Sequence, residues 1–259
     1  MRRILLILTG LLMPAFLFGQ AYRDGEYLRY KVHYFFLNAG YATLSVRETV
    51  LDGQPVFHAT GLGKSTALSS LVMEVDDRYE SYFDRQNRPL KFIRKVHEGD
   101  YRKDVEMQFD HRRHTVKVID KLHKVTNWFA VPRGVQDMLS AYYALRNVDA
   151  SRLKKGDVID QDLFFDNEVY HFRMKVLGRE TIRTKYGWIR TIVLRPIVQA
   201  ERVFKEQESL TVWVSDDQNK IPIRIKAKLL VGSIKADLTD YKNLKYPIRF
   251  TATSDQAAD

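Results

Sequence analysis

One short segment of the chain has the residue types of a phosphate-binding loop. Gly61-Leu62-Gly63-Lys64-Ser65 ends with the lysine and hydroxyl that hold a nucleotide's phosphates and its metal ion. The motif also needs a glycine where His58 stands, and it must follow a buried parallel strand and begin a helix. A strand is expected before this segment, but no helical pattern follows it. We therefore expect no nucleotide site here.

The histidines lack the spacing that a metal site requires. His111 and His114 are three residues apart, which places their side chains on opposite faces of a strand. Arg112 and Arg113 lie between them and repel a divalent cation. We interpret this segment as a solvated hairpin turn and predict no metal site.

Acidic pairs are the remaining candidates for catalysis. Asp76-Asp77 and Asp216-Asp217 are adjacent pairs that point apart in an extended chain and are typical of turns. No Gly-x-Ser-x-Gly segment supplies a nucleophile for acyl transfer. We predict no catalytic residue and no cofactor. The alternative, a hydrolase acting on envelope glycan, would need two carboxyl groups converging across a cleft.

A row of basic residues could support binding. Arg224, Lys226 and Lys228 alternate along one predicted strand, so they form a row with a spacing of about 7 Å on its solvent face. Lys91 and Lys95 stand at the positions equivalent to Arg224 and Lys228 in an internal repeat. Such a row suits an acidic polysaccharide or a layer of lipid headgroups. The alternative is a wetted sheet face, or lysines that protect an edge strand from pairing.

Aromatic residues gather near the start of the chain and around its middle. In a curved and partly open sheet they could line an apolar cavity for an acyl chain, with Trp128 and Phe129 as candidate ligand contacts. The alternative is the core of a protein that has no disulfides. The aromatic residues concerned are Tyr30, Tyr34, Phe35, Phe36, Tyr41, Trp128, Phe129, Tyr142 and Tyr143.

Residues 1–21 are typical of a cleaved secretory signal peptide. Met1-Arg2-Arg3 is positively charged, Ile4 to Leu12 is mostly apolar, and Gly19-Gln20-Ala21 supplies the small residues of a cleavage site. The apolar run is shorter than the roughly 20 residues of a membrane span, although retention as an anchor is the alternative. We expect a soluble periplasmic or secreted protein of a Gram-negative type of envelope, with no transmembrane span after cleavage.

The amino-acid composition is consistent with an exported protein. The chain has 0 Cys, so it has neither a disulfide framework nor the cysteine that a lipoprotein anchor requires. The net charge is +10, or +8 once Arg2 and Arg3 are removed with the leader. A basic protein outside the cytoplasm favours lipid or anionic polysaccharide as partner and not nucleic acid. Plain solubility is the alternative explanation of this charge.

A period of two dominates the rest of the chain and predicts half-buried antiparallel strands. Many short strands at close spacing predict an all-β fold, an antiparallel meander that forms a curved half-barrel, barrel or sandwich. The clearest alternating runs are Leu28–Phe36, Val105–Phe109, Phe172–Val176, Leu210–Val214, Ile223–Val231 and Ile234–Leu238.

One segment has helical spacing instead, and it joins two similar halves. Apolar residues from Val135 to Leu145 recur every three or four positions, which predicts a helix at about 134–147. Before and after it, Arg47-Glu48-Thr49 matches Arg179-Glu180-Thr181, and Asp84-x-Gln86-Asn87-Arg88 matches Asp216-x-Gln218-Asn219-Lys220 at the same offset. We interpret residues 22–250 as one domain made of a duplicated meander, about 27–110 and 159–243, and residues 251–259 as a disordered tail.

Four landmarks resemble a known family. They are Gly25-Glu26-x-Leu28-x-Tyr30-x-Val32, Asn38-Ala39-Gly40-Tyr41-Ala42-x-Leu44, Asp137-x-Leu139-Ser140-Ala141-x-Tyr143-x-Leu145-Arg146 and Trp213-Val214-Ser215-Asp216-Asp217-x-x-x-x-Pro222-Ile223-Arg224. In order and spacing they resemble the exported bacterial family named domain of unknown function 3108. The resemblance implies an all-β envelope protein, similar in shape to the unclosed barrels that carry lipoproteins between membranes. It implies no reaction and no functional residues.

These observations favour a non-catalytic envelope protein that binds a lipidic or acidic envelope component. The alternatives are the glycan hydrolase and a scaffold subunit of an envelope complex.

Overall fold

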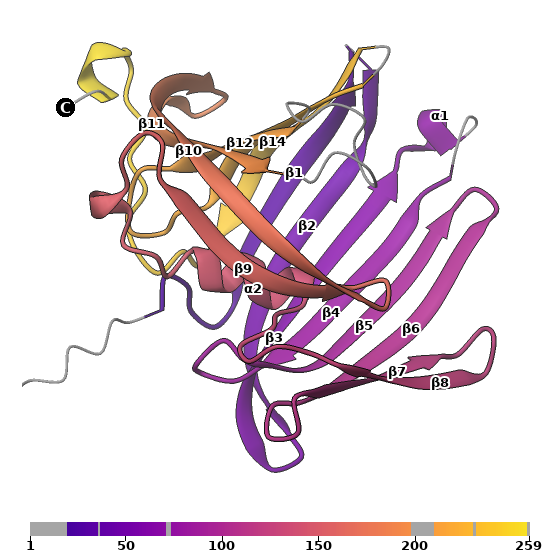
Figure 1. Ribbon diagram of the computed structural model, residues 1–259. Coiled ribbons are helices and arrows are strands. Elements are labelled where there is room, and N and C mark those ends of the chain that lie inside the picture. The colour runs from indigo at the N-terminus through magenta and orange to yellow at the C-terminus, as the bar shows by residue number, and fades with distance from the viewer. Residues whose placement is uncertain (1–19, 36, 71–73, 198–209, 230–231, 258–259) are drawn as a thin grey trace, which may run out of the picture.

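A single antiparallel sheet makes up most of the molecule (Figure 1). The computed structural model describes residues 20–35, 37–70, 74–197, 210–229 and 232–257. Their strands confirm the all-β prediction with one joining helix. In chain order they are β1 (Glu26–Tyr34), β2 (Leu37–Leu51), β3 (Gln54–Ser65), β4 (Asp76–Phe83), β5 (Pro89–Glu98), β6 (Tyr101–Asp110), β7 (Thr115–Asp120), β8 (Val125–Ala130), β9 (Val158–Phe165), β10 (Glu168–Thr184), β11 (Gly187–Ile197), β12 (Leu210–Ser215), β13 (Pro222–Lys228) and β14 (Ser233–Lys242).

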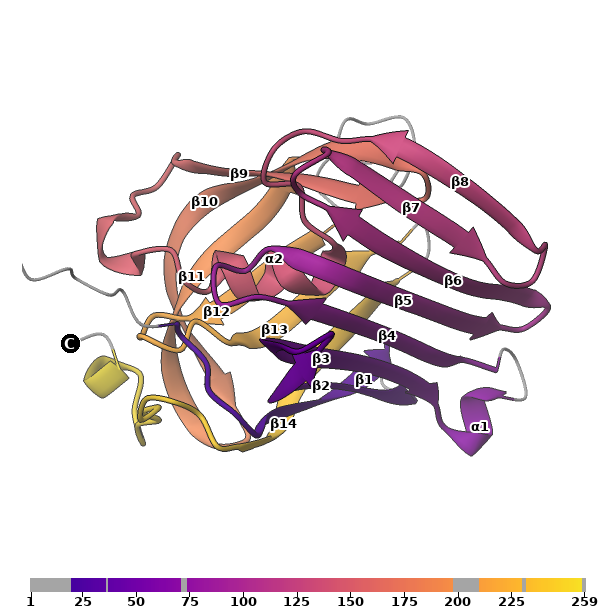
Figure 2. The same cartoon turned by 90° about the horizontal axis from the view of Figure 1, so that it is seen from below.

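The order of strands shows how the two halves meet. Strands β8 back to β1 follow one another, β1 then pairs with β14, and β14 back to β9 completes the 14-stranded sheet of the described residues. Because β8 and β9 end this order, the sheet is curved but not closed (Figure 2). The free edge of β9 is partly paired by Gln136, whose N–H donates to Asp162 and whose carbonyl accepts from Phe164. The structure therefore selects the open alternative among the predicted architectures.

The turns follow the residue types that the sequence places there. Asp52 and Gly53 join β2 to β3 with φ values of 49° and 79°, the left-handed pair that a two-residue hairpin requires. The segment that resembled a phosphate loop forms the end of β3 and pairs with both β2 and β4. Its backbone N–H groups are therefore committed to a strand and cannot surround a phosphate.

The joining helix α2 is Met138–Leu145, shorter than the predicted 134–147. It begins later because Gly134 turns the chain with φ 77° and Gln136 pairs with β9. Asp137 caps the helix: its carboxylate accepts the N–H groups of Leu139 and Ser140, and the Ser81 hydroxyl of β4 donates to it at 2.6 Å. The two shorter helices are α1 (Ala67–Ser70) and η1 (Ala150–Arg152), with a final turn η2 (Asp255–Ala257).

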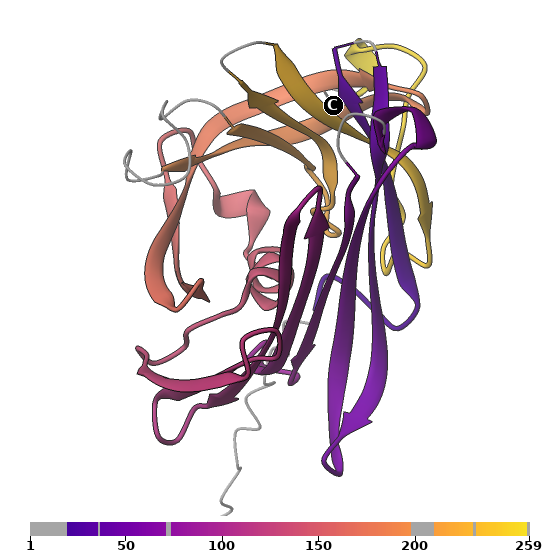
Figure 3. The same ribbon diagram turned by 90° about the vertical axis from the view of Figure 1, so that its right-hand side faces the viewer.

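The helix α2 lies inside the curve of the sheet (Figure 3). Leu139 and Tyr143 point into the main core, together with inward residues of β2 to β7. This core includes Tyr22, Val46, Phe57, Phe83, Phe92, Met107, Val116 and Phe164. Two smaller clusters lie toward β10–β14, one around Leu28, Ile223 and Leu238 and one around Ala150, Val176 and Ile192.

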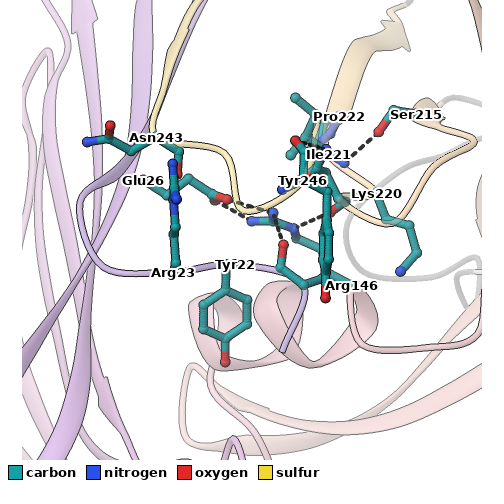
Figure 4. A network of polar contacts seen from close by, with 12 residues as sticks. Tyr22, Arg23, Glu26, Arg146, Ser215, Lys220, Ile221, Pro222, Asn243 and Tyr246 are labelled. Atoms are coloured by element: carbon teal, nitrogen blue, oxygen red, sulfur yellow. Dashed lines mark hydrogen bonds and ion pairs between the residues drawn. The ribbon is translucent and has the colours of Figure 1, made fainter. Parts of the chain in front are cut away.

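A buried ion pair lies where α2 ends (Figure 4). Arg146 and Glu26 are 2% and 1% exposed, and Arg146 Nη2 donates to Glu26 Oε2 at 2.8 Å. The guanidinium also donates to the carbonyl of Asn219, in the β12–β13 turn, and to that of Ala21. This cation is therefore held by acceptors from the start of the domain and from the β12–β13 turn.

The described fold includes residues beyond both predicted bounds of the domain, 22 and 250. Ala21 is buried and its N–H donates to Asn147, so the described fold includes one residue that cleavage after residue 21 would remove. At the other end, Thr251 pairs its backbone with Trp188, and a 3-10 turn follows. Residues 251–257 are therefore ordered, whereas a disordered tail was predicted for residues 251–259. Residues 1–19 of the predicted signal, Phe36, and residues 258–259 lie outside the described residues.

Replacing Arg146 tests the ion pair. Arg146→Ala strands the Glu26 carboxylate without its partner, and we expect the free energy of unfolding to fall by about 3 to 5 kcal/mol in urea denaturation. A Glu26→Leu/Arg146→Met double variant should recover part of this loss, because it leaves no unpaired buried charge. Arg152→Ala is the matched control, since its pair with Asp149 is exposed, and it should leave stability nearly unchanged. Equal effects of the two alanine variants would contradict this account.

Asp137 gives the fold a pH dependence. Burial raises the pKa of Asp137 from its ordinary value of 3.8 to about 6, although hydrogen bonds from Ser81, Ser140 and Leu139 favour the charged form. Between pH 3.8 and about pH 6, the Asp137 carboxyl group is protonated in the folded protein and ionised in the unfolded chain. The contribution of Asp137 to stability therefore decreases as pH rises from about 4 to 6.

Asp137→Asn removes this titration and keeps a side-chain acceptor at the cap. The stability of the variant relative to wild type should increase with pH across the window, by up to about 3 kcal/mol. Urea denaturation at several pH values measures the difference. Parallel stability curves for the two proteins would show that Asp137 does not titrate in this range.

Candidate functional site

A row of apolar residues crosses the inner face of the sheet from β2 to β10. The strand registers pair each member with the next, so all of them lie on one face. We call this the apolar row: Gly40, Val32, Ala236, Ile225, Val212, Leu194 and Val176.

Two contacts show that the apolar row is on the same side as α2. Gly40 shares its face of β2 with Val46, which packs in the core beside Leu139. At the other end, Val176 packs on Ala150, soon after the helix. The five members between the two ends are only half-buried, although they are apolar. The helix thus covers one part of the inner face and leaves this part accessible.

A pocket lies on the same inner face, near the open edge of the sheet. We call it the seam pocket; its volume is about 250 Å³. Apolar side chains of β6, β7 and β8 form one wall, and polar and charged side chains, with the tip of the β9–β10 hairpin, complete it. The lining residues are Arg94, Lys103, Val105, Met107, Val118, Asp120, His123, Val125, Asn127, Asp166 and Asn167.

The charges in the seam pocket are paired across the open edge. Arg94 Nη1 of β5 donates to Asp166 Oδ1 at 2.8 Å, and Lys103 of β6 contacts the same oxygen. Nearby, Phe129 of β8 packs against Phe164 of β9 with ring centroids 5.5 Å apart. The two ends of the sheet therefore meet through side chains and not through a strand ladder.

Two carboxyl groups do come together on the inner side of the sheet, at the ends of β4 and β5. Asp77 and Glu98 share a hydrogen bond, and burial together with the charge of Asp77 raises the pKa of Glu98. Asp77 also accepts the N–H of His97. Two carboxyl groups in hydrogen-bond contact leave no room for a sugar or a water between them.

The predicted basic residues lie on the outer face and do not form one site. Arg224 is bound to Asp237 at 2.6 Å, while Lys91 and Lys95 lie 3.4 and 3.8 Å from Glu106 and Asp104. Lys226 and Lys228 are exposed, and Lys226 stands opposite Lys235 of β14. Since β5 and β13 are separated by five strands, the two groups of basic residues remain apart.

The two predicted aromatic contacts point to opposite faces of β8. Phe129 packs on the core, whereas Trp128 is 60% exposed and has the Lys117 ammonium 5.7 Å from its ring. Alternation along a strand imposes this separation. Of the pair, only Phe129 lies on the inner face. Among the other aromatic candidates, Tyr30 and Tyr143 are buried core residues.

The other polar groupings are structural. His111 and His114 lie in the β6–β7 turn, as expected, and within the described residues no three His, Asp or Glu side chains gather as a metal site requires. Asp216 is paired with Arg179 and Arg190, and Asp217 accepts N–H groups of its own turn. Asp76 and Asp77 differ from the prediction, because they begin β4 and do not form a turn.

Arg94, Lys103 and Asp166 of the seam pocket were not predicted from the sequence. A signal existed: Arg94 interrupts the apolar positions of Phe92-x-Arg94-x-Val96, which marks a cation on the inner face. Asp166 gave no comparable signal, because Asp-Asn between two strands is an ordinary hairpin turn.

Comparison with known proteins finds similar folds among the solved structures. A search of curated proteins finds no match. A beta-barrel-like protein of domain of unknown function DUF1849 from Brucella abortus superposes with a TM-score of 0.56 at 10% identity, over 85% of this chain and 98% of the other. At this identity the likeness shows the fold alone.

Two further structures superpose less well. One is described as an exported protein with a YmcC-like fold from Bacteroides fragilis (TM-score 0.35, 8% identity, 86% of this chain and 99% of the other). Another is described as a lipoprotein from Parabacteroides distasonis (TM-score 0.34, 12% identity, 87% and 98%). No enzyme is named among these structures.

The family is given by the sequence itself. The pattern of the family described as "Protein of unknown function (DUF3108)" matches residues 29–239, which include every residue of the apolar row and of the seam pocket. The chain therefore belongs to the DUF3108 family, as its landmarks predicted.

Proposed function

We propose that the protein binds an amphiphilic envelope component with an acyl chain, and that the apolar row holds the chain. The observation that carries this proposal is the half-exposed apolar part of the inner face, from Val32 to Leu194. Water contact with these side chains is unfavourable, and each acyl methylene group transferred onto them contributes about 0.8 kcal/mol. A bound chain would complete the core that α2 begins.

The form of the sheet supports this proposal. Since β8 and β9 do not pair, the described residues leave the curve open along one side, and a long chain could enter without breaking a strand ladder. In the described residues, no helix is long and apolar enough to cross a membrane. The predicted signal at residues 1–21 would bring the protein to the periplasm or the outside, where envelope lipids are its natural ligands.

A glycan hydrolase is the second candidate, and the Asp77–Glu98 pair is the observation in its favour. The pair is already closed by a hydrogen bond, whereas hydrolysis requires two carboxyl groups several ångströms apart with substrate between them. The apolar row has no role in that reaction. We therefore favour binding.

The test compares two neighbouring residues of β13 that lie on opposite faces. Ile225→Gln places an amide in the apolar row, while Lys226→Gln changes the outer face only. We expect saturable binding of N-phenyl-1-naphthylamine, an uncharged fluorescent probe, to weaken about three- to tenfold in Ile225→Gln. Lys226→Gln should bind as wild type does.

Two further measurements complete the test. Thermal unfolding must show that both variants fold, and mass spectrometry of protein purified from envelopes should detect retained lipid. Absence of both probe binding and retained lipid would refute the proposed function. Turnover of an envelope glycan that is lost in Asp77→Asn would support the hydrolase instead.

A further inference from the structure

The seam pocket contains a cation that its surroundings do not fully satisfy. Arg94 is only 8% exposed, and its guanidinium lies 4.5 Å from the centre of the Phe165 ring and 6.0 Å from that of Tyr79. Its Nε is buried and has no hydrogen-bond partner among the described residues. A buried donor without an acceptor is costly, so the site is suited to a further acceptor.

Within the described residues, Asp166 supplies the carboxylate that contacts both Arg94 and Lys103. It stands at the tip of the β9–β10 hairpin, and φ values of 47° and 67° at Asp166 and Asn167 mark a tight two-residue turn. The other carboxylate in the pocket, Asp120, is bound to His123 and to N–H groups of its own turn. Among the described residues, Asp166 is thus the acid that contacts both cations, while Glu98 of β5 attracts Arg94 electrostatically.

We propose that Arg94 and Lys103 bind the anionic group of the ligand, a carboxylate or a phosphate, which replaces Asp166. The inference rests on the proposed function for the apolar part of the ligand and adds the class of its polar end. A carboxylate or phosphate has several oxygens and can accept from Arg94 Nη1, Arg94 Nε and Lys103 together. The aspartate now occupying this position accepts from Arg94 Nη1 and Lys103 only.

Replacement of Asp166 would also release the hairpin tip from β5 and β6. The apolar wall of the pocket, Val105, Met107, Val118 and Val125, lies on the same inner face of the sheet as the apolar row. Anion binding and opening of the sheet's free edge are thereby linked, because both compete with the same ion pairs.

The experiment measures displacement of N-phenyl-1-naphthylamine by decyl phosphate, decanoate and the uncharged decanol. Asp166→Asn removes the internal competitor, so decyl phosphate and decanoate should bind about tenfold more tightly to it than to wild type. Arg94→Gln and, separately, Lys103→Gln should weaken the two anions. Decanol should bind all four proteins equally.

Asp162→Asn is the matched control. Asp162 lies on the same hairpin but pairs with His171 outside the pocket, so its replacement should change none of the affinities. Hydrogen exchange of residues 163–170 should increase when decyl phosphate binds and should stay unchanged with decanol. Equal responses of Asp166→Asn and Asp162→Asn, or equal loss of decanol and decyl phosphate in Arg94→Gln, would overturn the proposal.

Inorganic phosphate distinguishes the source of the anion. Calorimetry measures the affinity of inorganic phosphate for wild type and for Arg94→Gln. If inorganic phosphate binds wild type as tightly as decyl phosphate and Arg94→Gln loses this binding, the site serves free phosphate and not a lipid headgroup. That result without binding of the apolar probe would refute the acyl-binding function and retain the anion site. Failure of every anion to bind would overturn the anion site itself.

Discussion

The buried pair of Glu26 and Arg146 is the interaction on which the arrangement of the two halves depends. It joins the first residue of β1, the residue after α2 and the β12–β13 turn, three parts of the chain that are far apart in sequence. A guanidinium removed from water is stable only when acceptors surround it. The positive charge also lies at the end of α2, where the helix dipole favours it. In a chain with 0 Cys, such a contact fixes relative positions that disulfides fix elsewhere.

The two halves approach this pair in a similar way. Asn87 and Asn219, which occupy matching positions in the predicted repeat, are both buried in hairpin turns. Asn87 accepts from Asn147, and the Asn219 carbonyl accepts from Arg146, so both turns contact the end of α2. This arrangement favours the duplicated meander, which remains a prediction, and explains why the helix lies at the join.

The same helix divides the inner face into two parts with different consequences. Under α2 the inward side chains of β2 to β7 are buried and stabilise the fold. Beyond it the members of the apolar row from Val32 to Leu194 stay half-exposed, although they are as apolar as the residues of the core. The proposed ligand would occupy this second part, and the seam pocket lies on the same inner face, near the open edge of the sheet. A short helix is thus sufficient for stability and leaves room for binding.

The sequence by itself determined the local features of this protein. Alternation gave the strands and their inner and outer faces, turn residues gave the hairpins, and apolar spacing gave α2, because each depends on neighbours within a few residues. The seam pocket and the Glu26–Arg146 pair depended on the tertiary structure. Arg94 and Asp166 are 72 residues apart, and Arg146 and Glu26 are 120 apart. The curvature of the sheet brings these distant residues together. This curvature depends on the packing of α2 and on the pairing of β1 with β14, which are tertiary contacts.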